Sequence, residues 1–289
     1  MSTAASYLAL TKPRLLPLVL FSGLPALVLA GGSWPSPRLT IATLLGTALC
    51  AAAASALNSY VERDRDALME RTRARPLPAG ELRPGPALAF GLILATIGTG
   101  LLWTWSGPTA AGIAVAAIAV YIFVYTLWLK PRTPFAVVVG GIAGAIAPLI
   151  ADAAVDGRVG AAGWLLFAII FIWQPPHFYA IALFRRDDYA RAGFPMLPDR
   201  IGVDATYGRI LLWTAVLIPV TLLPALLPGL GLVYLVAAIG LDALFLRQVL
   251  RLRARRDLES ARKLFLVSLV QLLGLFTAMI VDLGLARLI

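Results

Sequence analysis

Cysteine, histidine and charge are all scarce in this chain of 289 residues, which has one cysteine, one histidine and only 14% charged residues. A single cysteine excludes an intramolecular disulfide and any metal site built from several thiolates. Since 60% of the residues are hydrophobic, too few polar side chains remain to cover a water-soluble domain of this length. The composition therefore indicates a polytopic membrane protein.

Apolar runs of about 20 residues, the length that crosses the hydrocarbon core of a bilayer, recur along the whole chain. They predict an all-α protein with nine transmembrane helices in a single domain, residues 1–289. The expected spans are 14–31, 39–60, 86–106, 109–129, 135–154, 161–183, 208–227, 230–249 and 263–286.

The positive charges are distributed unevenly between the two predicted sides of the membrane. Of the 25 lysines and arginines, all but Arg38, Arg158 and Arg287 fall on one side. Because positively charged loops stay in the cytoplasm, we expect a cytoplasmic N-terminus, an external C-terminus and a location in the bacterial cytoplasmic membrane. The longest cytoplasmic loops, 61–85 and 184–207, are expected to cap a site on that side.

The net charge of +10 is not gathered in a domain outside the membrane. A nucleic-acid partner is therefore not expected, although clustered basic residues often bind nucleic acid. The charge instead favours attraction to anionic lipid or to an anionic substrate.

The segment LNSYVERDRDALMERTRARPLPAG, residues 57–80, follows a long apolar run and is dense in charge. On a helix, Asn58, Glu62 and Asp66 would share a face about 80° wide over about 12 Å, whereas Asp64 would point elsewhere. Oxygen ligands beside several arginines suit a diphosphate bridged by Mg²⁺. The alternative is a charge cluster at the membrane surface that only sets topology.

A second charged cluster lies in WQPPHFYAIALFRRDDYARAGFPMLP, residues 173–198. Asp187 and Asp188 end the sixth predicted span beside Arg185, at the same depth as the first cluster. Two facing acidic sites could hold Mg²⁺ around one diphosphate and polarise it as a leaving group. The alternative is that the aspartates only pair with the neighbouring arginines.

The same segment carries the single histidine, His177, directly after the pair 175–176 of prolines. Two prolines should kink or break the sixth span here. The imidazole could ligate haem iron, act as a base or hydrogen-bond a freed carbonyl. Trp173, Phe178 and Tyr179 could line a pocket for a flat ring or a carbocation, although aromatic residues are also common at membrane interfaces.

Two further basic segments are less specific. Residues 125–134 end the fourth span with Lys130 and Arg132; either side chain could reach a diphosphate, and topology alone also explains both. Residues 247–263 are mostly basic, and we interpret them as a solvated or lipid-facing connection without a catalytic part.

The middles of the predicted spans contain almost no ionisable residues, which argues against a transporter or proton pump. Asp242 is the main exception, and we expect it to hydrogen-bond a neighbouring helix. The carboxylates gather instead at the cytoplasmic ends of the second and sixth spans. This distribution favours a protein that handles a polar head group at the interface while an apolar tail lies between the helices.

At these residues the chain resembles the UbiA-type intramembrane prenyltransferases. Asn58, Glu62 and Asp66 match the diphosphate motif of that family, which continues here as residues 71–80, RTRARPLPAG. Residues 176–198 resemble most closely the branch of the family that prenylates haem rather than quinone precursors. Further similarity lies in residues 10–14, 129–134, 138–149 and 261–282.

The resemblance implies Mg²⁺-dependent transfer of a farnesyl group from farnesyl diphosphate to a vinyl group of haem B, with addition of water. The implied metal ligands are Asn58, Glu62, Asp66 and Asp188, with Asp187 as a further catalytic residue. The implied diphosphate-binding residues are Arg63, Arg71, Arg75, Lys130, Arg132 and Arg185. The implied haem-binding residues are His177, Trp173 and Tyr179. The implied pathway makes a haem A synthase a candidate partner.

The chain also departs from the family pattern. Glu62 stands where the family usually has aspartate, 151–152 reads Ala-Asp where Gly-Trp is expected, and Ala136 replaces a common asparagine. Two alternatives to haem prenylation remain. One is a UbiA-type enzyme acting on an aromatic or quinone precursor, and the other is a non-enzymatic carrier of haem or lipid. Mg²⁺-dependent release of pyrophosphate distinguishes an enzyme from a carrier.

Overall fold

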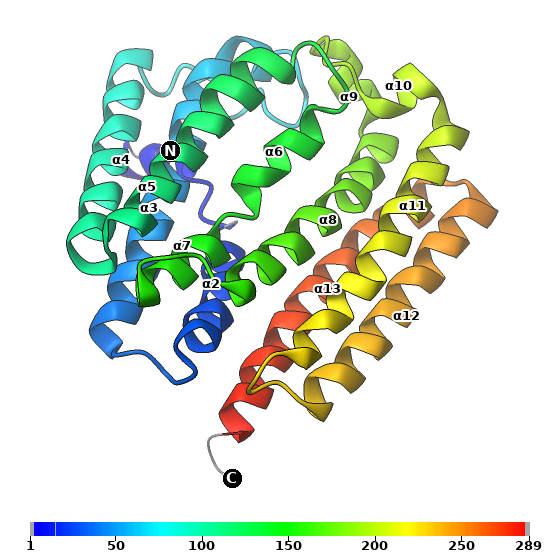
Figure 1. The fold of residues 1–289 in the computed structure, drawn as a ribbon. Helices are drawn as coiled ribbons and strands as arrows, with labels where there is room; N and C mark the ends of the chain where they lie inside the picture. Colours follow the sequence, from blue (N-terminus) through cyan, green and yellow to red (C-terminus); the bar gives the residue numbers. More distant parts are fainter. Residues whose placement is uncertain (1–2, 15, 287–289) are drawn as a thin grey trace.

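The computed structural model describes residues 3–14 and 16–286, and all regular structure within them is helical. Figure 1 shows a bundle with α3, α4 and α5 on one side, α11, α12 and α13 on the other, and α8 between them. The elements in chain order are α1 (Thr3–Leu10), α2 (Leu16–Gly31), α3 (Pro37–Asp66), α4 (Pro84–Ser106), α5 (Pro108–Ala119), the π-helix η1 (Val120–Leu129), α6 (Ala136–Gly144), α7 (Ala147–Asp156), α8 (Ala161–Phe184), α9 (Arg186–Arg191), α10 (Leu197–Ile201), α11 (Val203–Leu222), the 3₁₀ turn η2 (Leu223–Leu226), α12 (Leu232–Arg255) and α13 (Leu258–Leu285).

Within the described residues, eight helical stretches are long and apolar enough to cross a bilayer. They correspond to the second through ninth predicted spans, so the chain is a multi-pass membrane protein. The first predicted span corresponds to α2, which at 16 residues extends about 24 Å, less than the thickness of the hydrocarbon core. The count of nine spans and their orientation therefore remain predictions. Residue 15 of that span and Arg287 lie outside the described residues.

The helix α8 is the centre of the bundle. It packs against α11 and α13 on one side and against α6 and α7 on the other, while α3 packs mainly on α4. The prolines at 175–176 lie inside α8, which is continuous from Ala161 to Phe184, so a break here is excluded. Beside them Gln174 donates from Nε2 to the carbonyl of Gly141, 2.8 Å away. Contact with neighbouring helices allows membrane helices to tolerate proline.

The helix α3 carries the first charged cluster and is longer than the predicted span 39–60. It begins after Ser36, whose hydroxyl accepts from the Leu39 N–H, and Pro37 suits the first helical position. It ends at Asp66, whose carbonyl accepts from the Thr72 hydroxyl at 2.7 Å. The polar residues 58–66 are therefore helical, which is the condition for Asn58, Glu62 and Asp66 to share one face.

The buried Asp242 forms the interhelical hydrogen bonds that the sequence predicted. Its Oδ2 accepts from the Thr221 hydroxyl of α11 at 2.5 Å, and its Oδ1 accepts from Gln271 Nε2 of α13 at 2.7 Å. A carboxyl group satisfied on both oxygens holds three helices together.

Asp152 caps the start of α8 from the neighbouring helix α7. Its Oδ2 accepts from the backbone N–H of Gly160 at 3.0 Å and of Gly163 at 2.6 Å. A side chain at Gly163 would collide with this carboxylate, because a Cβ there would lie 2.3 Å from Oδ2. The Ala-Asp departure at 151–152 is thus explained by a negative charge at a helix N-terminus.

Replacing Asp152 with alanine is expected to destabilise the protein by about 2 kcal/mol, because one buried and one partly buried N–H group lose a charged acceptor. Thermal unfolding in detergent should show a midpoint lower by roughly 4–8 °C. The matched control is Asp156→Ala, which removes an exposed carboxylate from the same helix. Equal midpoints for both variants would contradict the capping role.

Candidate active site

Three polar side chains of α3 lie buried on the face predicted from their spacing. Asn58, Glu62 and Asp66 are 2%, 5% and 1% exposed. Asp64, between them in sequence, has a side chain that is 85% exposed. Burial of two carboxylates and an amide in a membrane protein requires partners for each of them.

Each of these three side chains contacts a cation from a different segment. Lys12 donates from Nζ to Asn58 Oδ1 at 2.9 Å. Lys130 forms an ion pair with Glu62, and Arg75 donates to Asp66 Oδ2 at 2.7 Å. Three positive charges thus stand against two carboxylates, since Asn58 is neutral. The arrangement leaves an excess of positive charge that favours an anionic ligand.

The sequence analysis did not assign a site role to Lys12. Its backbone is in the left-handed region, with φ of +51°, which is uncommon for a residue other than glycine. Burial, together with the charges of Arg75 and Lys130, lowers the pKa of Lys12 to about 8. The only available signal was the similarity of residues 10–14 to the family, because the contact with Asn58 spans 46 residues of sequence.

The π-helix η1 brings two more side chains to α3. Thr126 donates to the carbonyl of Tyr121, five residues earlier, at 2.7 Å, and its hydroxyl accepts from Asn58 Nδ2 at 3.2 Å. One turn later, Lys130 reaches Glu62. The wide helix therefore aligns positions 126 and 130 with positions 58 and 62 of α3.

The second acidic cluster separates into one buried and one exposed aspartate. Asp188, in α9, is buried and forms ion pairs with Arg191 and, at 3.9 Å, with Arg185. Asp187 is exposed. Of the two aspartates, Asp188 is therefore the one that pairs with neighbouring arginines, as the alternative interpretation of this cluster predicted.

The two predicted cap segments contact each other. Met69, from the segment after α3, packs in one buried cluster with Phe194, from the segment after α9. The guanidinium groups of Arg65 and Arg71 lie over the rings of Phe194 and Tyr189, at 5.0 and 5.8 Å. Lys130 lies 4.7 Å from the Phe194 ring centroid, so this aromatic residue connects the cap to the acidic face of α3.

Two of the basic residues assigned to the diphosphate point elsewhere. Arg132 donates from Nη1 to the carbonyls of Leu127 and Trp128, at 3.2 and 2.7 Å, and so satisfies the end of its own helix. Arg63 donates to the carbonyl of Tyr60 at 2.8 Å. Both contacts are local, whereas Lys130 and Arg75 bind the acidic face directly.

The donor set suits a hard divalent cation. Amide and carboxylate oxygens are the ligands that Mg²⁺ takes in proteins, and Asn58, Glu62, Asp66 and Asp188 offer only these. Among residues 3–14 and 16–286, no three acidic, histidine or cysteine side chains converge on one point. The carboxylates are paired with lysine and arginine instead, so a metal would have to replace these cations as their partner.

His177 is buried in a contact between α8 and α13. Its ring stacks on Trp173 with centroids 4.4 Å apart and lies 4.9 Å from Phe265. Nδ1 hydrogen-bonds the Ser268 hydroxyl at 2.7 Å, and Trp173 donates to the Ser268 carbonyl at 2.9 Å. The hydrogen bond from His177 to Ser268 fixes the orientation of the imidazole ring. No freed carbonyl of α8 is its partner.

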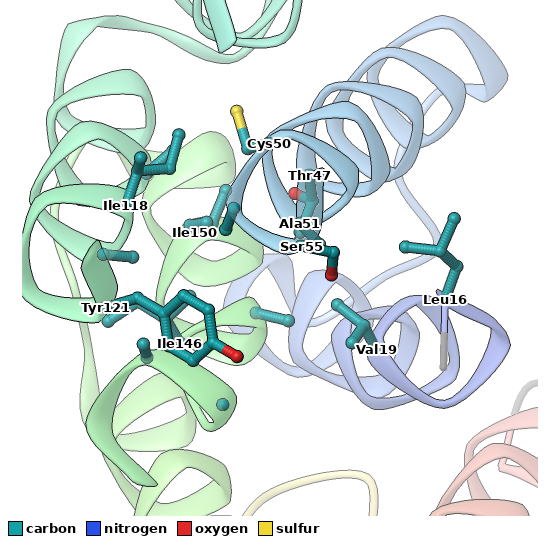
Figure 2. Close-up of a pocket in the computed structure, with 16 residues that line it drawn as sticks. Leu16, Val19, Thr47, Cys50, Ala51, Ser55, Ile118, Tyr121, Ile146 and Ile150 are labelled. Atoms are coloured by element: carbon teal, nitrogen blue, oxygen red, sulfur yellow. The ribbon is translucent and has the colours of Figure 1, made fainter. Parts of the chain in front are cut away.

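An apolar cavity of about 170 Å³ lies deeper in the bundle, along the same face of α3. Figure 2 shows that side chains from α2, α3, η1 and α7 surround it. Thr47, Ala51 and Ser55 precede Asn58 by one to three helical turns and line it on the α3 side, with Tyr121 opposite. The charged face and the apolar cavity therefore form one continuous surface of α3.

A second, smaller cavity of about 70 Å³ lies beside Lys130. Its walls include four aromatic residues, Tyr125, Phe178, Tyr189 and Phe194. Of these four, only Phe178 was predicted from the sequence to line a pocket, and the structure places it in the wall of this cavity. Trp173 and Tyr179, which were predicted with it, are buried and do not line this cavity.

A helical membrane bundle with a cation-paired acidic face above an apolar cavity has the design of an intramembrane transferase for amphiphilic diphosphates. The model of the UbiA prenyltransferase family matches residues 19–276, and the chain belongs to this family. Among curated relatives, the protoheme IX farnesyltransferase of Gloeobacter violaceus is 43% identical over 96% of this chain and 91% of its own length. The protein of the same name from Aromatoleum aromaticum is 44% identical over the same shares of the two chains.

Solved structures share the fold at low sequence identity. A digeranylgeranylglyceryl phosphate synthase aligns with a TM-score of 0.81 at 18% identity, over 98% of this chain and 99% of the other. A UbiA homologue from Aeropyrum pernix aligns with a TM-score of 0.74 at 19% identity, over 91% and 97%. A homologue from Archaeoglobus fulgidus, solved with GPP and Mg²⁺, aligns with a TM-score of 0.60 at 16% identity, over 95% and 99%.

Proposed function

We propose that this protein transfers a farnesyl group from farnesyl diphosphate to a vinyl group of haem B, so that haem O and diphosphate are formed. Relatives named protoheme IX farnesyltransferase match nearly the whole chain. The structural observation that carries the proposal is the apposition, on one face of α3, of a cation-paired acidic cluster and an apolar cavity.

The diphosphate would bind between the acidic face of α3 and the cations around it. Lys12, Arg75 and Lys130 already lie at that face, and each can transfer its contact to a phosphate oxygen. Arg185 and Arg191 would do the same beside Asp188. Arg71 would contribute from the cap, where it now lies over Tyr189.

Asn58, Glu62, Asp66 and Asp188 would hold Mg²⁺, with the exposed Asp187 as an additional acidic group. Bound there, the ion would supply polarisation of the diphosphate leaving group. The protein's own part is to fix the oxygen donors: Thr126 orients the Asn58 amide, and Thr72 fixes the end of α3 at Asp66.

The farnesyl chain would extend from the charged face into the apolar cavity. The cavity lining from Thr47 to Ser55 continues the face that carries Asn58, so head and tail of one amphiphile can occupy both parts. The ring of Tyr121 lines the cavity next to the charged end, where it can stabilise an allylic cation through its π face.

The reaction breaks the allylic C–O bond, and its electron pair leaves with the diphosphate. The vinyl π electrons of the porphyrin form the new C–C bond to farnesyl C1, which leaves a cation on the carbon next to the ring. Water adds to that carbon and loses a proton, giving the hydroxyl group. The cap segments joined through Met69 and Phe194 would exclude other water, which would otherwise trap the farnesyl cation.

His177 is the proposed contact to haem, together with Trp173, on which its ring stacks, and Tyr179. A histidine that ligates a metal usually has its other ring nitrogen held by a hydrogen bond. The bond from Nδ1 to Ser268 meets that requirement and leaves Nε2 for the ligand.

His177→Phe is expected to weaken haem binding at least about tenfold, equivalent to about 1.4 kcal/mol, while keeping an aromatic ring between Trp173 and Phe265. Spectroscopic titration of purified protein with haem measures the change. Ser268→Ala, which removes the orienting bond together with a local bond from the serine hydroxyl to the Phe265 carbonyl, should give a smaller loss. Wild-type affinity in the phenylalanine variant would limit His177 to helix packing.

The activity is tested by incubating purified protein with haem B, farnesyl diphosphate and Mg²⁺, followed by chromatography and mass spectrometry of the extracted haem. The expected product is heavier than haem B by a farnesyl group and a hydroxyl group and is absent with EDTA. If folded protein gives no such product but prenylates an aromatic acceptor, the haem assignment is wrong. If neither acceptor reacts and no pyrophosphate is released, the protein is a carrier.

The proposed cellular setting is the bacterial cytoplasmic membrane, with the active site on the cytoplasmic side, because the positive charges favour that orientation. A haem A synthase would consume the product and is the proposed partner. Co-purification of the two proteins from membranes is the direct test of that association.

A further inference from the structure

The cytoplasmic end of α12 carries a stripe of arginines that the transferase site does not use. Arg247, Arg251 and Arg255 follow at intervals of four residues on one exposed face. None of the three forms an ion pair within the described part of the chain, whereas nearby Arg256 pairs with Asp204 at 3.0 Å. Like charges four residues apart destabilise a helix, and the nearest acidic groups, Asp257 and Glu259 beyond the end of α12, interact only with Arg255 of the three and at longer range.

Two of these arginines line a cavity of about 180 Å³ between α12 and α13. Its walls are Arg251 and Arg255 from α12 and Lys263 from α13, which also forms an exposed ion pair with Glu259 at 2.5 Å. Its floor is polar, formed by the buried side chains of Gln248 and Ser260. Gln248 Nε2 donates to the Ser260 carbonyl at 3.2 Å, which fixes this floor to both helices.

A shallow, open apolar depression on α12 lies beside this cavity. It is lined by Ala243, Leu246, Leu250 and Ala254 together with the stems of Arg247 and Arg251. Arg251 belongs to both surfaces. A cationic pocket next to a shallow apolar depression has the charge pattern of a binding site for a charged amphiphile.

We propose that this α12–α13 site binds one anionic phospholipid. Its phosphate would bind Arg251, Arg255 and Lys263 through charge-assisted hydrogen bonds, and one acyl chain would lie in the depression past Leu250. Basic pockets between membrane helices at a bilayer surface bind lipid head groups in this way. The site shares no residue with the acidic face of α3 or its cavity, and the inference does not depend on the transferase reaction.

The test is native mass spectrometry of purified protein titrated in detergent with dioleoyl phosphatidylglycerol or, separately, with dioleoyl phosphatidylcholine. One phosphatidylglycerol should be retained and phosphatidylcholine should not. In Arg251→Gln/Arg255→Gln the affinity for phosphatidylglycerol should fall about thirtyfold, because each arginine contributes about 1 kcal/mol of attraction to an anionic lipid. The charge-matched control, Arg200→Gln/Arg253→Gln, removes two exposed arginines outside the cavity and should bind within about twofold of wild type.

Several outcomes would overturn the proposal. Equal losses of affinity in the two double variants would mean that the lipid is attracted non-specifically to basic residues. Equal retention of phosphatidylglycerol and phosphatidylcholine would mean that the site does not select lipids by head-group charge. Ala254→Trp fills the depression and should also weaken binding of phosphatidylglycerol. If it does not, while inorganic phosphate in excess displaces the lipid, the site binds a free anion rather than a lipid. Circular dichroism of each variant confirms that the helices are intact.

Discussion

Asp66→Asn is expected to abolish turnover, with at least about a hundredfold loss of pyrophosphate release in the presence of Mg²⁺ and farnesyl diphosphate. Asp66 is buried on the active face of α3 and binds Arg75 at 2.7 Å. Asparagine preserves its shape and one acceptor oxygen but removes the negative charge that a metal ion requires. Because the Arg75 side chain is 30% exposed, water can solvate it in the variant, and the helical fold should persist.

The matched control for this experiment is Asp64→Asn. Asp64 lies in the same helix, two residues earlier, and makes only a long contact of 3.7 Å to Arg63 at the surface. Its replacement removes the same charge from the same segment and should leave turnover within about twofold of wild type, as surface ion pairs contribute little. Comparable loss in both variants would mean that the net charge of α3 matters, rather than a specific ligand.

Lys130→Gln is expected to be nearly as damaging, with a loss of about a hundredfold in turnover. Lys130 forms the ion pair with Glu62 and lies beside Phe194 of the cap, so it can neutralise the departing diphosphate. Lys130→Arg, which retains the charge, should recover a substantial part of the activity. Pyrophosphate release measured over a range of farnesyl diphosphate concentrations separates a loss in kcat from a loss in KM.

The control for Lys130 is Arg132→Gln. Both residues were candidates for the diphosphate from sequence, and the structure separates them because Arg132 binds the carbonyls of Leu127 and Trp128. Its replacement should cost less than about threefold in turnover. If Arg132→Gln loses activity as strongly as Lys130→Gln, the side chain must leave its helix end and bind the substrate.

The helical architecture was predictable because a bilayer forces long apolar helices, and eight of the nine predicted spans match helices of sufficient length. The boundaries were less predictable where polar residues continue a helix beyond the apolar run. The helix α3 extends to Asp66 rather than ending at 60, and α11 begins at Val203 rather than at 208. Hydropathy alone does not detect a helix that leaves the membrane.

The candidate site was predictable where one helix carries it. The spacing of Asn58, Glu62 and Asp66 gave their common face, and burial of all three agrees with it. Contacts between residues far apart in the sequence were not predictable, such as the hydrogen bond from Lys12 to Asn58. Sequence also could not decide which of two adjacent aspartates is buried, because the short helix α9 that turns Asp188 inward has no hydrophobic repeat of its own.

The π-helix η1 has a consequence for the charged face of α3. An α-helix turns the chain by 100° per residue, whereas the i→i+5 hydrogen bonds of a π-helix give a wider turn that takes about one residue more. Such π segments are commonly found at functional sites. If the same ten residues were wound as an ordinary α-helix, Lys130 would be rotated away from Glu62, so the winding of this segment decides whether the charged face can hold a diphosphate.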